Sequence, residues 1–432
     1  MSAPLNILVR GGGITAPLAA LYLSRLLPES RARIGFEATD QDETAGAFAV
    51  LPDDIRSLHR LCRIKEADFI RQSEASFHLG FDLRGFGPAP YLNVNSNYGA
   101  LMGGSAFHLA MIAAGRTGPL SDWEAATLPA RMIRTGRFTP PQPRGPALLA
   151  NYGYGYHVDP GRYADVLRGL APSRADKAPD FIIETDAPAA FDHQSPLAAL
   201  GLSASAESRP RRLAMAATHT ATAGTIVVDS PSAAATTRTT LTVGSDGNLG
   251  RVGAAWTGKT IRLGPASGHL PPLMALPGRF LAAQLKLLGS LIPASGDGAV
   301  EAREYSRLSA RLHDRFDDFA QLLLATSGQA WAERIELSGT AAHKFALFKA
   351  RGRIAILDDD ELLQDHYVPM LLGNGVWPKR VDVMAARQTP DQVADTLGKL
   401  EASVANIVRQ LPAHDALLAK VTGRSAEMAR VG

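Results

Sequence analysis

The sequence predicts an α/β fold that begins with a Rossmann-like unit and continues into a mostly helical C-terminal region. An apolar run at residues 5–9 leads into a glycine-rich turn and then into residues 17–27, where apolar side chains recur at helical spacing. A second strand-like segment at residues 32–37 closes on an acidic residue. Helical patterns prevail after residue 300. Strand, glycine turn, helix and strand in this order are typical of a nucleotide-binding βαβ unit.

The glycine turn has the spacing Gly11-x-Gly13-x-x-Ala16. Gly11 permits the sharp bend, Gly13 lets the backbone approach a pyrophosphate, and Ala16 keeps the helix close to the strand. Glu37, at the end of the second strand, can accept hydrogen bonds from a ribose. These residues predict a dinucleotide site. The alternative is a βαβ unit that binds no ligand.

The composition favours a large globular protein and argues against several partners. The chain has 432 residues and a net charge of +3, with no basic stripe interleaved with aromatic residues, so we expect no binding to nucleic acid. One cysteine, Cys62, rules out an intrachain disulfide and suits a reducing compartment. The apolar runs are too short for a membrane span, and no signal peptide is recognisable. We therefore expect a cytoplasmic protein.

The remaining elements follow from local patterns along the chain. After an acidic loop at residues 38–46, we expect a helix over 51–69 and a strand over 75–83. A loop over 85–104 is expected to line a pocket with Tyr91 and Tyr98. It is followed by a helix over 107–114 and a loop over 131–146. A new unit then gives a helix at 161–171, strands at 180–185, 225–228, 239–243 and 260–263, a second glycine turn from Gly264 to Gly268, and a helix at 280–291.

Two regions are predicted from this order. Residues 1–295 form a nucleotide-binding domain, with a discontinuous core at 1–60, 150–190 and 250–295 and with substrate-side segments inserted between these parts. Residues 296–432 form the helical C-terminal region, interrupted by a Gly/Pro break at 373–378.

Five segments of the chain resemble the flavin-dependent tryptophan halogenase family, and the resemblance extends over most of the length. They are residues 156–159 (Y-H-V-D), 256–259 (W-T-G-K), 345–353, 371–382 with its G-N-G-V-W-P-K-R-V-D run, and 411–418 (L-P-A-H-D-A-L-L). The resemblance implies a flavin monooxygenase-like FAD domain with an added helical substrate region. It also implies FAD as the cofactor, bound through residues at the two glycine turns and the second strand: Gly11, Gly13, Ala16, Glu37, Gly264 and Gly268.

The resemblance implies an activity as well. Members of this family use reduced FAD, oxygen and a halide to halogenate an indole, and a lysine delivers the halogen beside a glutamate. A flavin reductase would supply the reduced flavin. A full-length halogenase paralogue and a dimer are further partners that the resemblance allows, and the substrate would be a small indole or a peptide.

The chain departs from the family at the residues that carry this chemistry. His78, in the strand S-F-H-L-G, stands in place of the lysine, and Met274 stands in place of the glutamate. Leu276 and Pro277 replace a Thr-Gly pair, and the proline has no backbone N–H to offer a halide. The tryptophan motif W-x-W-x-I-P is missing from the corresponding residues 223–231.

The segments that would bind the nucleotide also differ from those of the family. Residues 172–179 connect helix and strand directly, where the family has intervening strands beneath the adenosine. Residues 184–187 read Glu-Thr-Asp-Ala, where the family has D-C-S/T-G, and the region 200–250 is compressed.

Several single residues allow more than one interpretation. His78 is either a general base or halogen carrier, or a tolerated replacement in a substrate tunnel that no longer serves catalysis. A metal pair of His78 with His269 is poorly supported, and we predict no metal site. Trp256, Trp377 and Met274 are expected to pack in the core, and the acidic run at 358–361 to cap a helix in solvent.

The sequence therefore leaves three functions open. The first is flavin-dependent halogenation of an indole or tryptophan. The second is a non-catalytic paralogue, a pseudoenzyme that pairs with an active halogenase or binds a peptide or indole ligand. The third is a flavoprotein oxidoreductase, with a monooxygenase fold, that uses His78 differently.

Overall fold

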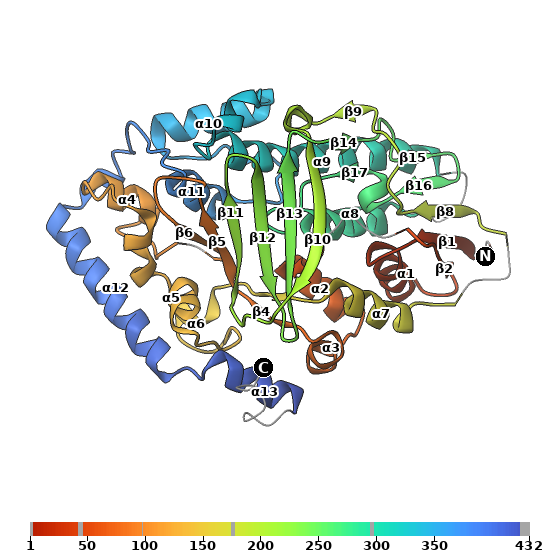
Figure 1. Ribbon diagram of the computed structural model, residues 1–432, viewed down its shortest axis with the longest axis horizontal. Coiled ribbons are helices and arrows are strands. Elements are labelled where there is room, and N and C mark those ends of the chain that lie inside the picture. Colours follow the sequence, from red (N-terminus) through yellow and green to blue (C-terminus); the bar gives the residue numbers. More distant parts are fainter. Residues whose placement is uncertain (1–2, 42–45, 97, 174–177, 294–297, 424–432) are drawn as a thin grey trace.

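The computed structural model describes residues 3–41, 46–96, 98–173, 178–293 and 298–423, and it confirms an α/β fold (Figure 1). The N-terminal unit consists of β1 (Leu5–Gly11), α1 (Thr15–Leu26) and β2 (Ala32–Ala38). β1 lies at the inside of a five-stranded sheet of order β15-β16-β8-β1-β2, which includes β8 (Phe181–Glu184), β16 (Thr260–Arg262) and β15 (Trp256–Thr257).

The apolar run and the helical spacing explain this unit. β1 pairs in parallel with β2 on one side and with β8 on the other, which buries the side chains of Ile7 and Val9. α1 is apolar almost all round because it packs against the sheet strands β1 and β2, and also against α7 (Pro160–Leu170) and α8 (Leu276–Leu291).

A second, six-stranded sheet crosses the middle of the molecule (Figure 1). Its order is β10-β13-β12-β11-β5-β6, built from β10 (Leu202–Arg209), β13 (Thr236–Val243), β12 (Thr225–Pro231), β11 (Ala216–Ala221), β5 (Gly80–Arg84) and β6 (Tyr91–Val94). The sequence predicts β12 and β13 from their alternating Thr, Val and Ile residues, but it does not predict β10 and β11, which are rich in Ala and Ser.

Four local predictions were wrong in extent. The loop expected at 85–104 contains the buried strand β6, and Tyr91 in this strand donates to Oδ1 of Asn374 instead of lining the pocket that contains Tyr98. The helix expected at 51–69 is two helices, α2 (Asp53–Leu61) and α3 (Glu66–Ser73), because Arg63 between them takes a left-handed conformation with φ +58°. The strand expected at 75–83 divides at Leu79 into β4 (Ser76–His78) and β5, which belong to different sheets. The loop expected at 131–146 begins inside helix α5 (Leu128–Thr135).

Short elements complete the first 295 residues. One three-stranded sheet consists of β3 (Val50–Leu51), β7 (Gly155–His157) and β4. Another consists of β9 (His193–Gln194), β14 (Gly250–Arg251) and β17 (Gly268–His269). The short helices are α4 (Phe107–Ala113) and α6 (Ala147–Ala150). The predicted loop at 38–46 and the predicted connection at 172–179 lie partly outside the described residues.

The C-terminal region is helical, as predicted. It contains α9 (Ala299–Ala325), α10 (Gly339–Arg351), α11 (Gln364–Gly373), α12 (Pro390–Gln410) and α13 (His414–Thr422). Buried side chains form one apolar core around the five-stranded sheet and a second core around the six-stranded sheet, and α12 contributes to both. No helix within the described residues is both long enough and apolar enough to cross a membrane.

The acidic run at residues 358–361 does not cap a helix, contrary to the prediction, and is only partly solvated: Asp358 and Glu361 are exposed, but Asp360 is not. Asp360 is buried, and both of its carboxylate oxygens lie 2.6 Å from the Nζ atom of Lys344, which is also fully buried. The ammonium of Lys344 lies 4.8 Å from the ring centroid of Tyr367 in α11. The ion pair therefore ties α10 to the segment that follows it, and the ammonium also contacts α11 through Tyr367.

Candidate functional site

The structure brings the two predicted glycine turns together at the N-terminal end of α1. Gly11 has a φ of +151° and Gly13 has a φ of +60°, both values that favour glycine, and Ala16 is fully buried in the first turn of α1. Gly264 also has a positive φ of +58°, and a Cβ atom placed on it would lie 2.8 Å from Cγ2 of Thr15. The N-terminus of α1 is thus framed by both turns.

A carboxylate of the chain itself lies against this turn. Asp186, which follows β8, accepts a hydrogen bond from the backbone N–H of Gly12 (2.9 Å) at Oδ1 and one from the hydroxyl of Thr39 (2.8 Å) at Oδ2. In the sequence Asp186 stands where the family has Ser or Thr. One N–H donor of the turn is therefore already occupied, and the group that occupies it carries a negative charge.

The chain's own packing also accounts for two of the glycines. A Cβ atom on Gly11 would lie 1.9 Å from Oγ1 of Thr185, and one on Gly12 would lie 1.7 Å from the carbonyl oxygen of Gln41. No side chain fits at either position. The glycines are required here whether or not a ligand approaches the turn.

Glu37 lies at the end of β2, as predicted, and faces a charged neighbour. Its register partner in β1 is Arg10, whose guanidinium forms an ion pair with Glu184 at the end of β8. The hydrogen bond that Arg10 donates to Glu184 is the largest influence on the pKa of Arg10 and raises it, and the charge of Glu37 makes a smaller contribution in the same direction. The end of the sheet where a ribose would bind thus carries an internal charge network.

The second glycine turn is also satisfied internally. The N–H of Gly264 donates to Oε1 of Gln284 at 2.8 Å, and a Cβ atom on Gly268 would lie 2.4 Å from Cδ2 of His313 in α9. The amide of Gln284 in turn donates to the hydroxyls of Ser267 and Ser309. Gly264 and Gly268 therefore have structural partners of their own.

As these residues lie, they do not fit the pyrophosphate of FAD. A pyrophosphate at the N-terminus of α1 would be placed beside the fixed charge of Asp186, and like charges at contact distance repel each other. It would also find one donor of the turn already taken and the carbonyl of Gln41 packed against Gly12.

His78, the candidate in place of the catalytic lysine, is fully buried in β4. Its Nδ1 lies 3.3 Å from Nε2 of His157, and its Nε2 has no hydrogen-bond partner among the described residues. Burial, and then the neighbouring His157, lower the pKa of His78 well below its usual value. The ring is therefore neutral at ordinary pH and closed off from solvent.

His269 lies in a different environment from His78. Its Nδ1 lies 2.8 Å from the carbonyl of Asn248, and its own carbonyl faces His313. Among the described residues, no group of three or more His, Cys, Asp or Glu side chains is arranged to hold a metal ion.

Residues 274–277, which we call the halide loop because they correspond to the family's halide-binding segment, have an unusual backbone conformation. Met274 and Ala275 have φ values of +51° and +57°, which are uncommon for residues other than glycine. The N–H of Met274 donates to Nε2 of buried His219 at 3.1 Å, and Pro277 lies in the first turn of α8. The side chain of Met274 is buried, as expected for a core residue. The turn is thus held by protein contacts.

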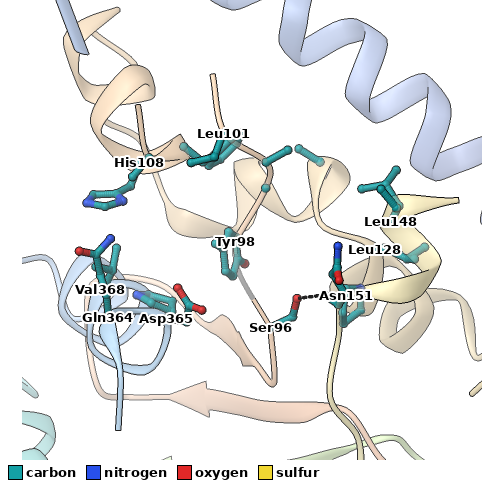
Figure 2. A pocket seen from close by; sticks show the side chains of 18 residues that line it. Ser96, Tyr98, Leu101, His108, Leu128, Leu148, Asn151, Gln364, Asp365 and Val368 are labelled. Carbon is teal, nitrogen blue, oxygen red and sulfur yellow. Dashed lines mark hydrogen bonds between the residues drawn. The ribbon is translucent and has the colours of Figure 1, made fainter. Parts of the chain in front are cut away.

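An open cavity of about 390 Å³ lies on the other side of the molecule, between the segment after β6, helices α4, α5 and α6, and the first turns of α11 (Figure 2). The sequence predicts its first wall from the Gly- and Asn-rich loop that carries Tyr98, but it does not predict the wall formed by α11. The side chains that line it are mostly apolar: Ala100, Leu101, Ala106, Phe107, Ala126, Leu128, Pro129, Ala147, Leu148, Val368 and Pro369.

Six of the lining residues are polar: Ser96, Tyr98, His108, Asn151, Gln364 and Asp365. Figure 2 shows Tyr98 between the helix that carries Gln364 and Asp365 and the segment that carries Asn151. The hydroxyl of Tyr98 is buried and has no hydrogen-bond partner within the described residues. Partial burial raises the pKa of Asp365. Burial raises the pKa of Tyr98 well above its usual value, and the charges of Glu124 and Arg134, which do not line the cavity, also act on its hydroxyl. Burying a polar group without a hydrogen-bond partner costs free energy.

Solved structures show which class of protein has this architecture. The flavin-dependent halogenase BrvH from Brevundimonas sp. BAL3 superposes with a TM-score of 0.84 at 19% identity, covering 96% of this chain and 99% of that chain. Xcc4156, a flavin-dependent halogenase from Xanthomonas campestris, gives 0.84 at 18% identity, with coverage of 98% and 99%. SttH, a tryptophan 6-halogenase from Streptomyces toxytricini, gives 0.81 at 15% identity, with coverage of 97% and 100%. The fold is that of the flavin-dependent halogenases.

The sequence match is as broad as the structural one. The family model described as tryptophan halogenase matches residues 6–178 and 227–390. The chain therefore belongs to the tryptophan halogenase family, as its sequence motifs predict. No curated protein matches the chain by sequence.

Proposed function

We propose that this chain is a non-catalytic member of the tryptophan halogenase family that binds a small aromatic ligand of the indole class in the cavity beside Tyr98. It does not hold FAD in the manner of the family and does not halogenate its ligand. The observation that carries the proposal is the position of Asp186, whose carboxylate takes the backbone donor of Gly12 in the turn where a dinucleotide would bind.

The remaining catalytic positions support the same conclusion. A lysine ammonium at the family position can donate hydrogen bonds, whereas the ring of His78 is neutral, buried and directed at His157. Met274 has no carboxylate in place of the family glutamate, and Pro277 has no N–H. Cofactor site, halogen carrier and halide loop are thus altered together, which favours loss of the reaction over a change of substrate.

The cavity supports the binding role. Its volume of about 390 Å³ lies in the range of small-molecule sites, about 300–1,000 Å³. Apolar walls with a few polar groups suit an aromatic ring that carries one N–H donor. The solved relative SttH is described as a tryptophan halogenase, which makes the indole ring the first ligand class to test.

Two measurements test the proposal. Incubation with reduced FAD, oxygen, bromide and tryptophan should give no bromotryptophan by mass spectrometry, and a product that depends on the protein would contradict the loss of catalysis. Titration with indole, followed by calorimetry or ligand-observed NMR, should show saturable binding. The absence of saturable binding would contradict the binding role.

A pair of tyrosine variants locates the ligand. Tyr98→Phe removes only the unpartnered hydroxyl and should weaken indole binding by about tenfold, the effect of one lost hydrogen bond. Tyr305→Phe makes the same change where the hydroxyl donates to the carbonyl of Arg262, outside the cavity, and should leave the affinity unchanged. Equal affinities for the two variants would place the ligand elsewhere.

A further inference from the structure

A second polar pocket lies on α9, away from the cavity beside Tyr98. It has a volume of about 270 Å³ and opens between β9, β14 and one face of α9. Five lining residues of α9 follow helical spacing: His313, Asp314, Asp317, Asp318 and Gln321. Polar residues at this spacing within a largely buried helix need partners that the surrounding structure must supply.

Two of the three aspartates have such partners in arginines. The guanidinium of Arg251 binds the carboxylate of Asp314 through two hydrogen bonds of 2.7 and 3.1 Å. The guanidinium of Arg315 donates to Asp318 at 2.8 Å, and the hydroxyl of Ser338 donates to the other oxygen of that carboxylate.

Asp317 is the exception. It is only 5% exposed, and its partners are the neutral hydroxyl of Ser195 (2.7 Å) and the neutral amide of Gln321 (2.8 Å). The backbone N–H of Ser338 donates to Oε1 of Gln321, which fixes the amide with its NH2 group toward Asp317. No ion pair joins Asp317 to a lysine, arginine or histidine of the described residues.

A buried carboxylate without a counter-charge is unfavourable unless a cation joins it. Burial raises the pKa of Asp317, which reflects this cost. Both carboxylate oxygens nevertheless accept hydrogen bonds, an arrangement suited to the ionised form.

His313 adds a second acceptor. The residue is 2% exposed, and its Nδ1 has no hydrogen-bond partner in the described part of the chain. Its Nε2 faces the carbonyl of His269 at 3.4 Å, and its Nδ1 lies 3.8 Å from Oδ1 of Asp314, too far for a hydrogen bond. A ring that donates from Nε2 leaves Nδ1 as an acceptor. The pocket therefore combines a buried carboxylate that forms no ion pair within the described residues with a buried imidazole nitrogen that makes no hydrogen bond there.

We propose that this pocket binds a primary ammonium group through the carboxylate of Asp317 and Nδ1 of His313. An ammonium supplies three N–H donors and one positive charge, which match the two acceptors and the missing counter-charge. A metal ion is a poorer match, because the described residues form no cluster of three metal-ligating side chains. The ammonium comes from a free small amine or from a lysine side chain, which share this chemistry. The site is independent of the cavity beside Tyr98 and of the proposed function.

The proposal is tested by titrating the full chain at pH 7.5 with n-butylammonium, with an acetylated and amidated Gly-Lys-Gly peptide, and with tetramethylammonium. Calorimetry should detect saturable binding of at least one of the two primary ammonium compounds, and the one that binds identifies the source. Tetramethylammonium carries the same charge without N–H donors and should not bind. Absence of binding by both primary ammonium compounds, or equal binding of tetramethylammonium, would overturn the proposal.

Two variants locate the binding. Asp317→Asn removes the charge and should weaken affinity by at least about tenfold, because a hydrogen bond to a charged group is lost. Gln194→Trp places a large side chain at the exposed mouth of the pocket and leaves the Asp317 network intact, so it should also abolish binding. If Asp317→Asn does not fold, Gln194→Trp decides the question. Wild-type affinity in Gln194→Trp would overturn the proposal.

Discussion

The turn at the N-terminus of α1 and the cavity beside Tyr98 differ in whether their polar groups have hydrogen-bond partners within the protein. At the turn, the donor of Gly12 is satisfied by Asp186, that of Gly264 by Gln284, and the guanidinium of Arg10 by Glu184. In the cavity, the hydroxyl of Tyr98 has no partner among the described residues. A site whose groups are satisfied internally gains little from a ligand, whereas a site with open groups gains a hydrogen bond. This difference is the basis of the proposal that the cavity, and not the turn, binds a ligand.

Acid should have the largest effect on stability, because several buried histidines must take up protons when the chain unfolds. Burial lowers the pKa of His59 and His157 to about 3 and that of His414 to about 4, while the unfolded chain titrates near 6.5. The unfolded state therefore binds more protons below pH 6.5, so this stability is complete above that pH and is lost as the pH falls toward 4 to 3.

Each of these histidines should cost about 2 kcal/mol of unfolding free energy between pH 7 and pH 5. Urea unfolding measured at pH 7, 6 and 5 checks this expectation. An unfolding free energy that stays constant over this range would show that the rings are protonated in the folded chain.

Removing the buried cation behind the cavity should have the next largest effect. Lys344→Met leaves the carboxylate of Asp360 buried without its partner and loosens α11, which carries one wall of the cavity. We expect a loss of about 3–5 kcal/mol in unfolding free energy. Lys399→Met breaks an exposed pair with Asp395 and should cost less than about 0.5 kcal/mol. Similar losses for the two variants would mean that the buried pair contributes no more than a surface pair.

The halide-loop backbone offers a gain in stability. Ala275 has a φ of +57°, and glycine tolerates this conformation without the steric cost that a Cβ atom brings. Ala275→Gly should raise the unfolding free energy by about 0.5–1 kcal/mol. Ala402→Gly, at an exposed position inside α12, should lower it by about 1 kcal/mol. Thermal denaturation of both variants separates the two signs, and a loss in both would show that the strain at Ala275 is absent.

The smallest effect on stability is expected at the open cavity itself. Tyr98→Phe removes a hydroxyl that makes no hydrogen bond within the described chain, so the unfolding free energy should change by less than about 0.5 kcal/mol. A loss above 1 kcal/mol in chemical denaturation would mean that the hydroxyl already has a partner in the folded protein.

Sequence patterns predicted the parts of the fold that depend on local periodicity. The βαβ unit, α4, β8 and the C-terminal helices all follow from apolar spacing, and the family motifs place them in one architecture. α5 was missed because it is short and lies next to a Pro- and Arg-rich segment, and β10 because its Ala and Ser residues carry no strand signal.

The candidate sites could be predicted only in part, because they depend on contacts between distant segments. The glycines of both turns are visible in the sequence, but the approach of Asp186 to Gly12 joins residues 174 positions apart. Likewise, Tyr98 marks one wall of the cavity, whereas the wall from α11 comes from the other end of the chain. The helical spacing of His313, Asp317 and Gln321 was an available signal for the α9 pocket that the sequence interpretation did not use.

Direct titration with FAD tests the closed turn most directly. We predict that the wild-type chain shows no saturable binding of FAD by calorimetry or flavin fluorescence up to high micromolar concentration. Asp186→Ser removes the carboxylate from the turn and should gain measurable affinity. Asp180→Ser removes an acid from the other end of β8, where it accepts from the N–H of Asn6, and should behave like the wild type. Micromolar binding of FAD to the wild-type chain, unchanged in Asp186→Ser, would contradict the account.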